Sequence, residues 1–388
     1  MRILYGYSNC TDKTYNRIVS ERNVSVLQPD QKYHGLLIKG LAKNGAEVRC
    51  FTGLPVNRAV TSRKIIREKD EREGNAFFHY ITTVNLPVLR QLMIFFGTFF
   101  GVLKAKKDQE TYAVCDCLNF ANAYGMIFAA KLRRIKTMLI VTDLPDVQTK
   151  AKLRPWLNGR IFSLSDAFLF LTEQMNPKLN KKNKPYIVLE GHVDADMPAL
   201  QPKPPRDKGA AQVVMYAGSL HRIYGICNLT EGFLAAAVPG AELHVYGDGD
   251  FKDELVQLSR QHPSVRYQGI KMNAEIVQKE YEASVLVNPR PVNQEFTPYS
   301  FPSKTLEYMM SGTPVITTRL PGIPEEYFDV LYVFQDDTPQ GIADTLRDFF
   351  GQPEQARLER GMQARKFAEQ NKSNVVQSHK ILEFLKRL

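Results

Sequence analysis

Lys304 and Glu307 stand out in the segment YSFPSKTLEYMMSGTPVITT, residues 299–318, which predicts a short helix. Lys304 falls in the first turn of this helix, where a cation opposes the helix dipole unless an anion lies in front of it. Glu307 lies one turn further on, near the same face, and its carboxylate could accept hydrogen bonds from a diol such as ribose. The pair therefore indicates a nucleotide site. The alternative is an ion pair between the two residues on the helix surface.

The ends of this helix carry residues that commonly bound helices. Ser300 or Ser303 can cap its first turn, Pro302 lies near that turn, and Gly312 follows its last turn. We expect the two serines to lie beside the ligand of Lys304.

A glycine-containing turn, YAGSLHRIYGI at residues 216–226, precedes this segment. We expect a strand to end at Gly218 and a helix to begin near Gly225, so that a phosphate could approach the backbone and the free amides of the helix. Arg222 could add a bidentate contact to a diphosphate. A tight turn with an exposed arginine is the alternative.

The apolar runs predict an α/β fold in both halves of the chain. In the first half we expect a strand at residues 2–7, a helix at 31–43, a strand at 47–52 and buried strands at TMLIVTD and AFLFLT. After residue 210, strands and helices alternate again from VVMYAG to PVITT. This alternation is typical of two doubly wound, Rossmann-like domains. Such sheets bind ligands at the carboxyl ends of their strands, so we expect the domains to face a central cleft.

The 388 residues exceed one compact core, and the composition indicates where the domains divide. Residues 1–200 form the first predicted domain. Residues 201–210, QPKPPRDKGA, are rich in proline and charge and predict a linker. Residues 211–365 form the second domain, and we expect residues 366–388 to form a helix that packs back on the first.

Basic residues are concentrated in the first half. Residues 1–200 contain 30 Lys and Arg against 18 Asp and Glu, whereas the remainder contains 21 against 23. This asymmetry indicates an anionic partner, and its alternative is a solvated basic surface. We expect no nucleic acid, because aromatic residues are not interleaved with the basic ones.

The cysteines and the N-terminus indicate a cytoplasmic protein. The five cysteines form no metal-binding pattern, and we expect Cys115 and Cys117 to be half-buried strand residues. The segment MRILYGYS predicts a strand rather than a signal peptide.

Residues 86–103 form a mostly apolar stretch that is marginal for a membrane span, and Lys104, Lys106 and Lys107 follow it. A helix of this kind can lie in the interface of an anionic bilayer. The alternative is a buried domain helix.

The segment FPSKTLEYMMSGTPVITT, together with YAGSLHRIYGI and VYGDGD, resembles the donor-binding domain of GT-B glycosyltransferases of the retaining family-4 type. The resemblance covers the C-terminal half, and the N-terminal half matches in pattern only. It implies a nucleotide diphosphate sugar as the donor, with Glu307 on the ribose and with Gly218, Ser219 and Gly247 lining the nucleotide site. It also implies retention of configuration. We expect no metal, because cations of the chain can neutralise the diphosphate.

Three positions depart from the family's pattern. Tyr299 stands where the family has the first Glu of its E-x7-E motif, Ser219 replaces an arginine, and Tyr224 replaces a lysine. We expect Tyr299 or Ser300 to contact the donor sugar. We assign catalytic roles to Arg222 and Lys304 as the cations that stabilise the leaving diphosphate.

In the first domain, IVTDLPD places Thr142 where the family often has a histidine. Asp143 and Asp146 could bind an acceptor hydroxyl, and we assign Asp143 a catalytic role. Both could equally be loop or capping residues. Residues 7–9 end the first strand and could also lie beside the acceptor.

The sequence therefore predicts a cytoplasmic glycosyltransferase, of the hexosyltransferase type, peripheral at the inner face of the membrane. Its acceptor would be a saccharide or lipid-linked saccharide in polysaccharide or glycoconjugate assembly. One alternative is a sugar-nucleotide epimerase or hydrolase of the same fold, which would need acid and base groups but no acceptor groove. The other is a non-catalytic nucleotide-sugar-binding subunit, which the missing glutamate and lysine favour.

Overall fold

The computed structural model describes residues 1–22, 29–56, 61–144, 154–197 and 211–388. Its internal contacts divide the chain into two compact units. Unit 1 comprises Met1–Ala195 and Ser373–Leu388, and unit 2 comprises Asp196–Lys372. The predicted linker, residues 201–210, lies outside the described residues, as does Asp146.

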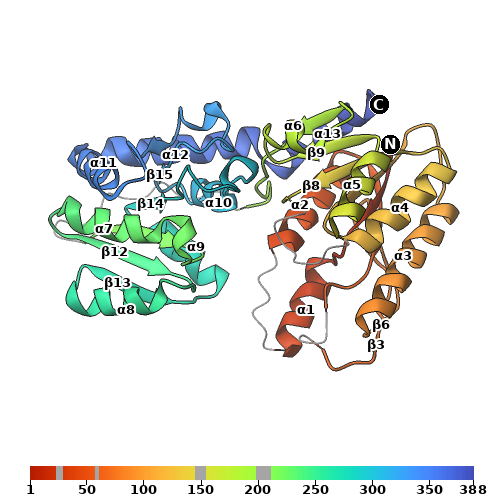
Figure 1. Cartoon of the computed structure of the whole chain (residues 1–388), viewed down its shortest axis with the longest axis horizontal. Helices are drawn as coiled ribbons and strands as arrows, with labels where there is room; N and C mark the ends of the chain where they lie inside the picture. The colour runs from red at the N-terminus through yellow and green to blue at the C-terminus, as the bar shows by residue number, and fades with distance from the viewer. Residues whose placement is uncertain (23–28, 57–60, 145–153, 198–210) are drawn as a thin grey trace. The chain divides into compact units, whose positions relative to one another are not determined.

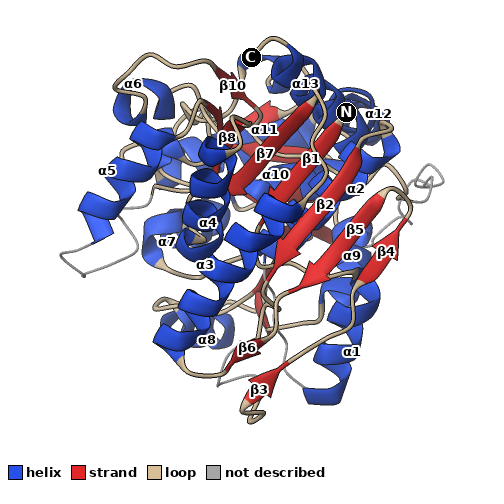
Figure 2. Ribbon diagram, turned by 90° about the vertical axis from the view of Figure 1, so that its right-hand side faces the viewer, coloured by secondary structure: helices blue, strands red, loops and turns tan. Residues whose placement is uncertain are grey.

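Unit 1 is built on an eight-stranded sheet in the order β10-β9-β8-β7-β1-β2-β5-β4 (Figure 2). Neighbouring strands are parallel, except that β4 pairs antiparallel with β5 at the edge. The strands of this sheet are β1 (Arg2–Gly6), β2 (Glu47–Thr52), β4 (Glu71–Glu73), β5 (Ala76–Tyr80), β7 (Thr111–Asp116), β8 (Lys136–Val141), β9 (Ala167–Phe170) and β10 (Tyr186–Val188). A separate antiparallel pair is formed by β3 (Ile65–Ile66) and β6 (Thr83–Val84).

The helices of unit 1 cover its sheet. They are α1 (Asp12–Arg22), α2 (Pro29–Lys43), α3 (Pro87–Lys104), α4 (Phe120–Leu132), α5 (Arg154–Leu164), α6 (Met175–Leu179) and α13 (Asn374–Lys386). The central strands are buried almost throughout, because helices pack on both sheet faces, and this explains their continuous apolar runs. Cys115 and Cys117 are fully buried, so the prediction that they are half-buried is wrong.

The C-terminal helix α13 belongs to unit 1, where it packs on α2. The amide of Asn374 donates to the carbonyl of Leu36 at 2.9 Å, and the amide of Gln377 donates to the carbonyl of Gly191 at 2.9 Å. A Cβ on Gly40 would lie 2.2 Å from the carbonyl oxygen of Asn374, so the two helices approach at a glycine. The predicted C-terminal segment begins at residue 366, whereas the chain returns to unit 1 at Ser373.

Unit 2 has a six-stranded parallel sheet in the order β13-β12-β11-β14-β15-β16 (Figure 1). Its strands are β11 (Gln212–Ala217), β12 (Ala241–Tyr246), β13 (Val265–Gly269), β14 (Val285–Asn288), β15 (Val315–Thr317) and β16 (Tyr332–Val333). Its helices are α7 (Ile226–Ala236), α8 (Lys252–Gln261), α9 (Asn273–Glu282), α10 (Ser303–Met310), α11 (Pro339–Gly351) and α12 (Glu354–Asn371). Its described residues also form the short 3-10 turns η1 (Arg222–Tyr224), η2 (Thr297–Tyr299) and η3 (Glu325–Tyr327).

Both sheets reverse their strand order beside the first strand of the unit. The reversal lies between β1 and β7 in unit 1 and between β11 and β14 in unit 2. The predicted architecture of two doubly wound, Rossmann-like α/β domains is therefore confirmed. In such a sheet, the carboxyl ends of the two strands at the reversal are the place where a ligand binds.

Candidate functional site

Two glycines with positive φ make close backbone contacts at the carboxyl edge of the unit 2 sheet. Gly247 has φ 136°, and a Cβ there would lie 1.9 Å from the carbonyl oxygen of Gly218. Gly225 has φ 83°, and a Cβ there would lie 2.1 Å from the carbonyl oxygen of Pro289. The turn between β11 and α7 thus contacts both the end of β12 and the segment after β14, at the reversal of the strand order.

The first turn of α7 points its amides at this edge. The N-cap residue of α7 is Gly225, and no side chain caps the first turn. Uncapped amides and the partial positive charge of a helix N-terminus favour an anion.

Arg290 follows β14 at the same reversal, and no motif of the sequence pointed to it. Its Nη1 donates to the hydroxyl of Ser300 at 3.1 Å, and its guanidinium lies over the rings of Tyr224 and Phe296, at 5.3 and 5.6 Å from their centroids. Its buried Nε has no hydrogen-bond acceptor, and within the described part of the chain it forms no ion pair with a carboxylate. Burial lowers the pKa of this guanidinium.

Arg222, the cation that the turn predicted, lies in η1 and is exposed. Its guanidinium pairs with the carboxylate of Glu254, which raises the pKa of Arg222, and it lies 5.0 Å from the ring centroid of Phe251. The structure therefore places Arg222 with a carboxylate of α8.

Lys304 and Glu307 form the ion pair that the sequence left as the alternative. Nζ of Lys304 lies 2.8 Å from Oε1 of Glu307 and 3.6 Å from Oε1 of Glu280, which is buried on α9. The lysine side chain is 35% exposed and the Glu307 side chain 20% exposed, so both remain accessible to a ligand. The first turn of α10 thus carries a cation that two carboxylates already balance.

The predicted cap of α10 is wrong. The helix begins at Ser303, its N-cap residue is Pro302, and no side chain caps it. The hydroxyl of Ser300 accepts from Arg290 instead. Ser303 is already helical and exposed.

Tyr308 attaches α10 to the end of β11. Its hydroxyl lies 2.9 Å from the amide nitrogen of Ala217 and 3.1 Å from the carbonyl oxygen of the same residue. Ser219 follows, with its carbonyl accepting from the hydroxyl of Tyr216 at 2.8 Å. Tyr299 lies in η2, directly before Ser300. The predicted residues of unit 2 therefore come from segments that meet at the carboxyl edge of its sheet, although Arg222 in the β11–α7 turn is paired with Glu254 of α8.

Unit 1 gathers polar side chains at its own reversal. The hydroxyl of Thr142 donates a hydrogen bond to the carboxylate of Asp116 at 3.1 Å. Nε2 of His34 lies 3.4 Å from the same buried carboxylate. The ring of Tyr7 stacks on His34 with a centroid distance of 3.6 Å. Asp143 lies beside Thr142, half-buried, and accepts from the amide of Leu144 at 2.7 Å. The sequence did not single out His34 or Asp116, although Asp116 ends an apolar strand.

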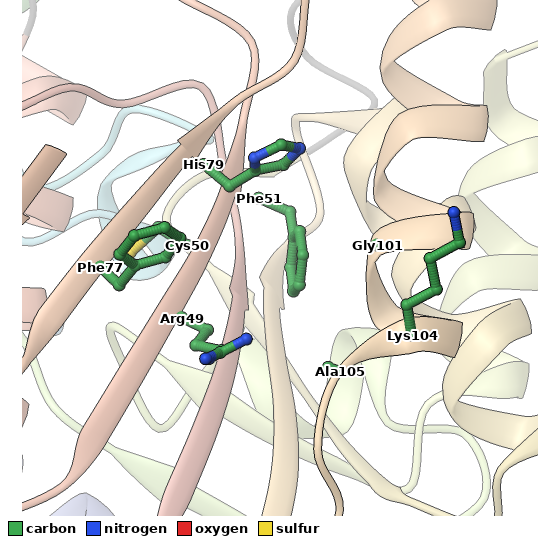
Figure 3. Close-up of a pocket in the computed structure, with 8 residues that line it drawn as sticks. All are labelled: Arg49, Cys50, Phe51, Phe77, His79, Gly101, Lys104 and Ala105. Atoms are coloured by element: carbon green, nitrogen blue, oxygen red, sulfur yellow. The ribbon is translucent and has the colours of Figure 1, made fainter. Parts of the chain in front are cut away.

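A cavity of about 190 Å³ opens elsewhere in unit 1, between β2, β5 and the end of α3 (Figure 3). Two of its polar lining residues are already paired, since Arg49 binds Glu47 at 3.1 Å and His79 binds Asp70 at 2.9 Å. None of the predicted site residues lines it. In the residues that the structure describes, no three His, Cys, Asp or Glu side chains are grouped to hold a metal ion.

A GT-B fold contains two Rossmann-like domains, and solved structures with that fold are similar to the whole chain. HepE from Anabaena, crystallised in complex with UDP, is 14% identical, with all of both chains covered and a TM-score of 0.66. Sucrose-phosphate synthase from Thermosynechococcus elongatus is 16% identical, with 100% of this chain and 99% of that chain covered and a TM-score of 0.66. WaaB, a lipopolysaccharide outer core galactosyltransferase, is 16% identical over all of both chains with a TM-score of 0.60.

The sequence itself gives the enzyme class. Residues 211–351 match the family model described as glycosyl transferases group 1, which corresponds to most of unit 2. A comparison with curated proteins gives no match. The protein is therefore a glycosyltransferase of the GT-B fold, as the sequence predicted.

Proposed function

We propose that the protein transfers a hexose from a UDP-sugar to a hydroxyl of a saccharide or lipid-linked saccharide. The observation that carries the proposal is the carboxyl edge of unit 2. The uncapped start of α7, the contact of Gly225 with Pro289 and the carboxylate of Glu307 all lie within the residues that match the group 1 family model. Uridine is supported by structures of the same fold, since HepE is described in complex with UDP and with UDP-glucose. The supports for saccharide assembly are WaaB and the resemblance of the FPSKTLEYM segment.

The proposed reaction breaks the bond between the anomeric carbon and the β-phosphate oxygen, and the bonding electrons leave with UDP. The acceptor oxygen forms the new bond to the anomeric carbon, and its proton passes to the departing phosphate. Charge grows on the diphosphate as the bond breaks, so donors fixed at that point accelerate the reaction. We propose retention of configuration from the family resemblance, with Glu307 on the ribose and Asp143 on the acceptor.

A panel of nucleotide sugars tests this function. We expect UDP-sugars to raise the melting temperature of the protein, because a ligand that binds only the folded state stabilises it. With a saccharide acceptor, UDP release should equal glycoside formation. Epimerisation or hydrolysis without acceptor would instead favour the epimerase or hydrolase, and stabilisation without any turnover would favour the binding subunit. The absence of stabilisation by every nucleotide sugar would contradict the proposal.

We further propose that unit 1 docks on an anionic bilayer at the cytoplasmic side. Seven large apolar side chains are at least 40% exposed on the neighbouring helices α3 and α4, and we call them the α3–α4 face: Val88, Leu89, Leu92, Phe96, Phe100, Phe128 and Leu132. Exposed basic residues adjoin the face at the ends of both helices: Lys104, Lys106, Lys107, Lys131 and Arg134. Apolar insertion together with charge attraction is how interfacial helices bind anionic lipid. The five free cysteines are compatible with a reducing compartment.

The packing of α3 favours an orientation in the plane of the interface. Within the described residues, α3 is long and apolar enough to cross a membrane. However, Ile94, Thr98 and Val102 are buried in unit 1, and a Cβ on Gly125 of α4 would lie 2.5 Å from the carbonyl oxygen of Phe95. Leaving the unit would expose this packed face, so the helix is better placed to lie on the bilayer.

The double substitution Phe96→Glu and Phe100→Glu tests the docking. We expect it to lower co-sedimentation with phosphatidylglycerol vesicles about tenfold or more, because two half-exposed phenyl rings no longer enter the lipid. The matched control is Ile270→Glu, which alters an exposed apolar residue of unit 2. Equal vesicle binding by the double variant and the parent would rule the docking out. A dimer that the double substitution dissociates would instead assign the face to a second copy of the chain.

A further inference from the structure

The leaving diphosphate of a nucleotide sugar needs cationic groups, and the two cations that the sequence proposed are balanced by carboxylates. Arg222 pairs with Glu254, and Lys304 pairs with Glu307 and Glu280. A cation that already holds a carboxylate must lose that contact before it can bind phosphate fully. A cation at the carboxyl edge of unit 2 that holds no carboxylate could bind phosphate without losing such a contact.

Arg290 is such a group. It lies two residues after the end of β14, one of the two strands at the reversal, and it lies across from the turn that leads into α7. Its environment contains the aromatic rings of Tyr224 and Phe296 and the hydroxyl of Ser300, but in the described residues no ion-paired carboxylate. Its Nε is buried without an acceptor. A half-buried guanidinium with an unused donor is costly unless an anion completes it.

The backbone around Arg290 holds it in place before any ligand arrives. Pro289 and Pro291 flank it and fix the local φ angles. The carbonyl of Pro289 lies against Gly225, and the carbonyl of Pro291 accepts from the hydroxyl of Thr297 at 3.1 Å. The rings of Tyr224 and Phe296 contact each other with centroids 5.7 Å apart, so the guanidinium lies against a packed aromatic pair. Such preorganisation lowers the entropy that binding would otherwise lose.

We propose that Arg290 binds the diphosphate of the donor and stabilises the charge that develops on it as the sugar leaves. The guanidinium acts together with the uncapped amides of α7, which face the same reversal. Arg290 thus takes the role of the cations that Ser219 and Tyr224 replace in the turn. This assignment rests on the proposed function for the identity of the ligand, but the anion site itself does not depend on the base or the sugar.

The test compares UDP, uridine and inorganic pyrophosphate by calorimetry for the parent and for Arg290→Gln. Glutamine is neutral and keeps side-chain atoms out to the position of the arginine Nε, so it removes the charge while it retains part of the packing. We expect the Kd of UDP and of pyrophosphate to rise about 30-fold or more, since hydrogen bonds to charged groups are the strong ones. The Kd of uridine should change less than threefold. The catalytic rate with saturating UDP-sugar should fall as well, because the charge that Arg290 meets is larger in the transition state.

Two further variants make the outcome unambiguous. Arg347→Ala removes an exposed arginine that pairs with Asp344 on α11, and it should leave all three affinities unchanged. Arg222→Ala tests the competing cation. Unchanged UDP affinity in Arg290→Gln, or an equal loss for uridine and UDP, would overturn the assignment, and a selective loss in Arg222→Ala alone would transfer the role to Arg222. If the parent binds pyrophosphate through Arg290 but binds no nucleotide, the proposed function fails while the anion site stands. If the parent binds neither, both fail.

Discussion

Replacement of Glu307 by alanine is expected to weaken UDP binding about 100-fold. The carboxylate of Glu307 would accept hydrogen bonds from both ribose hydroxyls, and each hydrogen bond to a charged group contributes about 1.5–3 kcal/mol. The same contacts are made to uridine, so uridine should be weakened as much as UDP, whereas pyrophosphate should bind as before or more tightly because Lys304 loses a carboxylate partner. Calorimetry with the three ligands measures this pattern.

Glu282→Ala is the matched control for Glu307→Ala. Glu282 is a half-exposed carboxylate of α9 that also pairs with a lysine, Lys279, at 2.7 Å. It should retain the parent affinity for all three ligands. Equal UDP binding by Glu307→Ala and the parent would show that the ribose lies elsewhere.

Gly225→Ala should damage both the stability of unit 2 and its binding of the donor. A left-handed φ of 83° costs an L-residue about 1–2 kcal/mol. The added Cβ would lie 2.1 Å from the carbonyl oxygen of Pro289, and relief of such an overlap costs about 1–3 kcal/mol more. Movement of Pro289 would also shift Arg290, so we expect the melting temperature of unit 2 to fall by several degrees and the affinity for UDP to fall more than tenfold.

Gly240→Ala separates the cost of the backbone angle from the cost of the overlap with Pro289. Gly240 also has a positive φ, 69°, but a Cβ there meets no atom within 4 Å. Its variant should therefore show only the cost of the backbone angle and should bind UDP like the parent. If Gly225→Ala and Gly240→Ala have the same melting temperature and the same UDP affinity, the contact between Gly225 and Pro289 does not hold the site together.

The sequence predicted the regular elements well where one element carries its own signal. Continuous apolar runs gave β8 and β9, and the strand expected at residues 47–52 coincides with β2. The antiparallel pairing of β4 with β5 was not predicted. The short runs Glu71–Glu73 and Ala76–Tyr80 become strands only when they pair within the sheet. The place of α13 on α2 depends on contacts between residues more than 300 positions apart, such as Asn374 and Leu36.

In the candidate site too, the sequence predicted contacts within one element but not contacts between elements. Helix spacing alone predicts that Lys304 and Glu307 lie close together. The sequence allowed two interpretations of the pair, a nucleotide site and a surface ion pair. The partner of Arg222, Glu254, lies on another helix and could not be inferred from the turn. Arg290 was missed because its neighbours Tyr224, Phe296 and Ser300 come together only once β14 lies next to β11. A cation flanked by two prolines after an apolar strand was the available signal.

A crystal structure of the protein with UDP tests the central claim most directly. The account predicts the diphosphate at the start of α7 within hydrogen-bond distance of the guanidinium of Arg290, and the ribose hydroxyls on the carboxylate of Glu307. UDP bound with its phosphates on Arg222 and α8, or in unit 1, would contradict it.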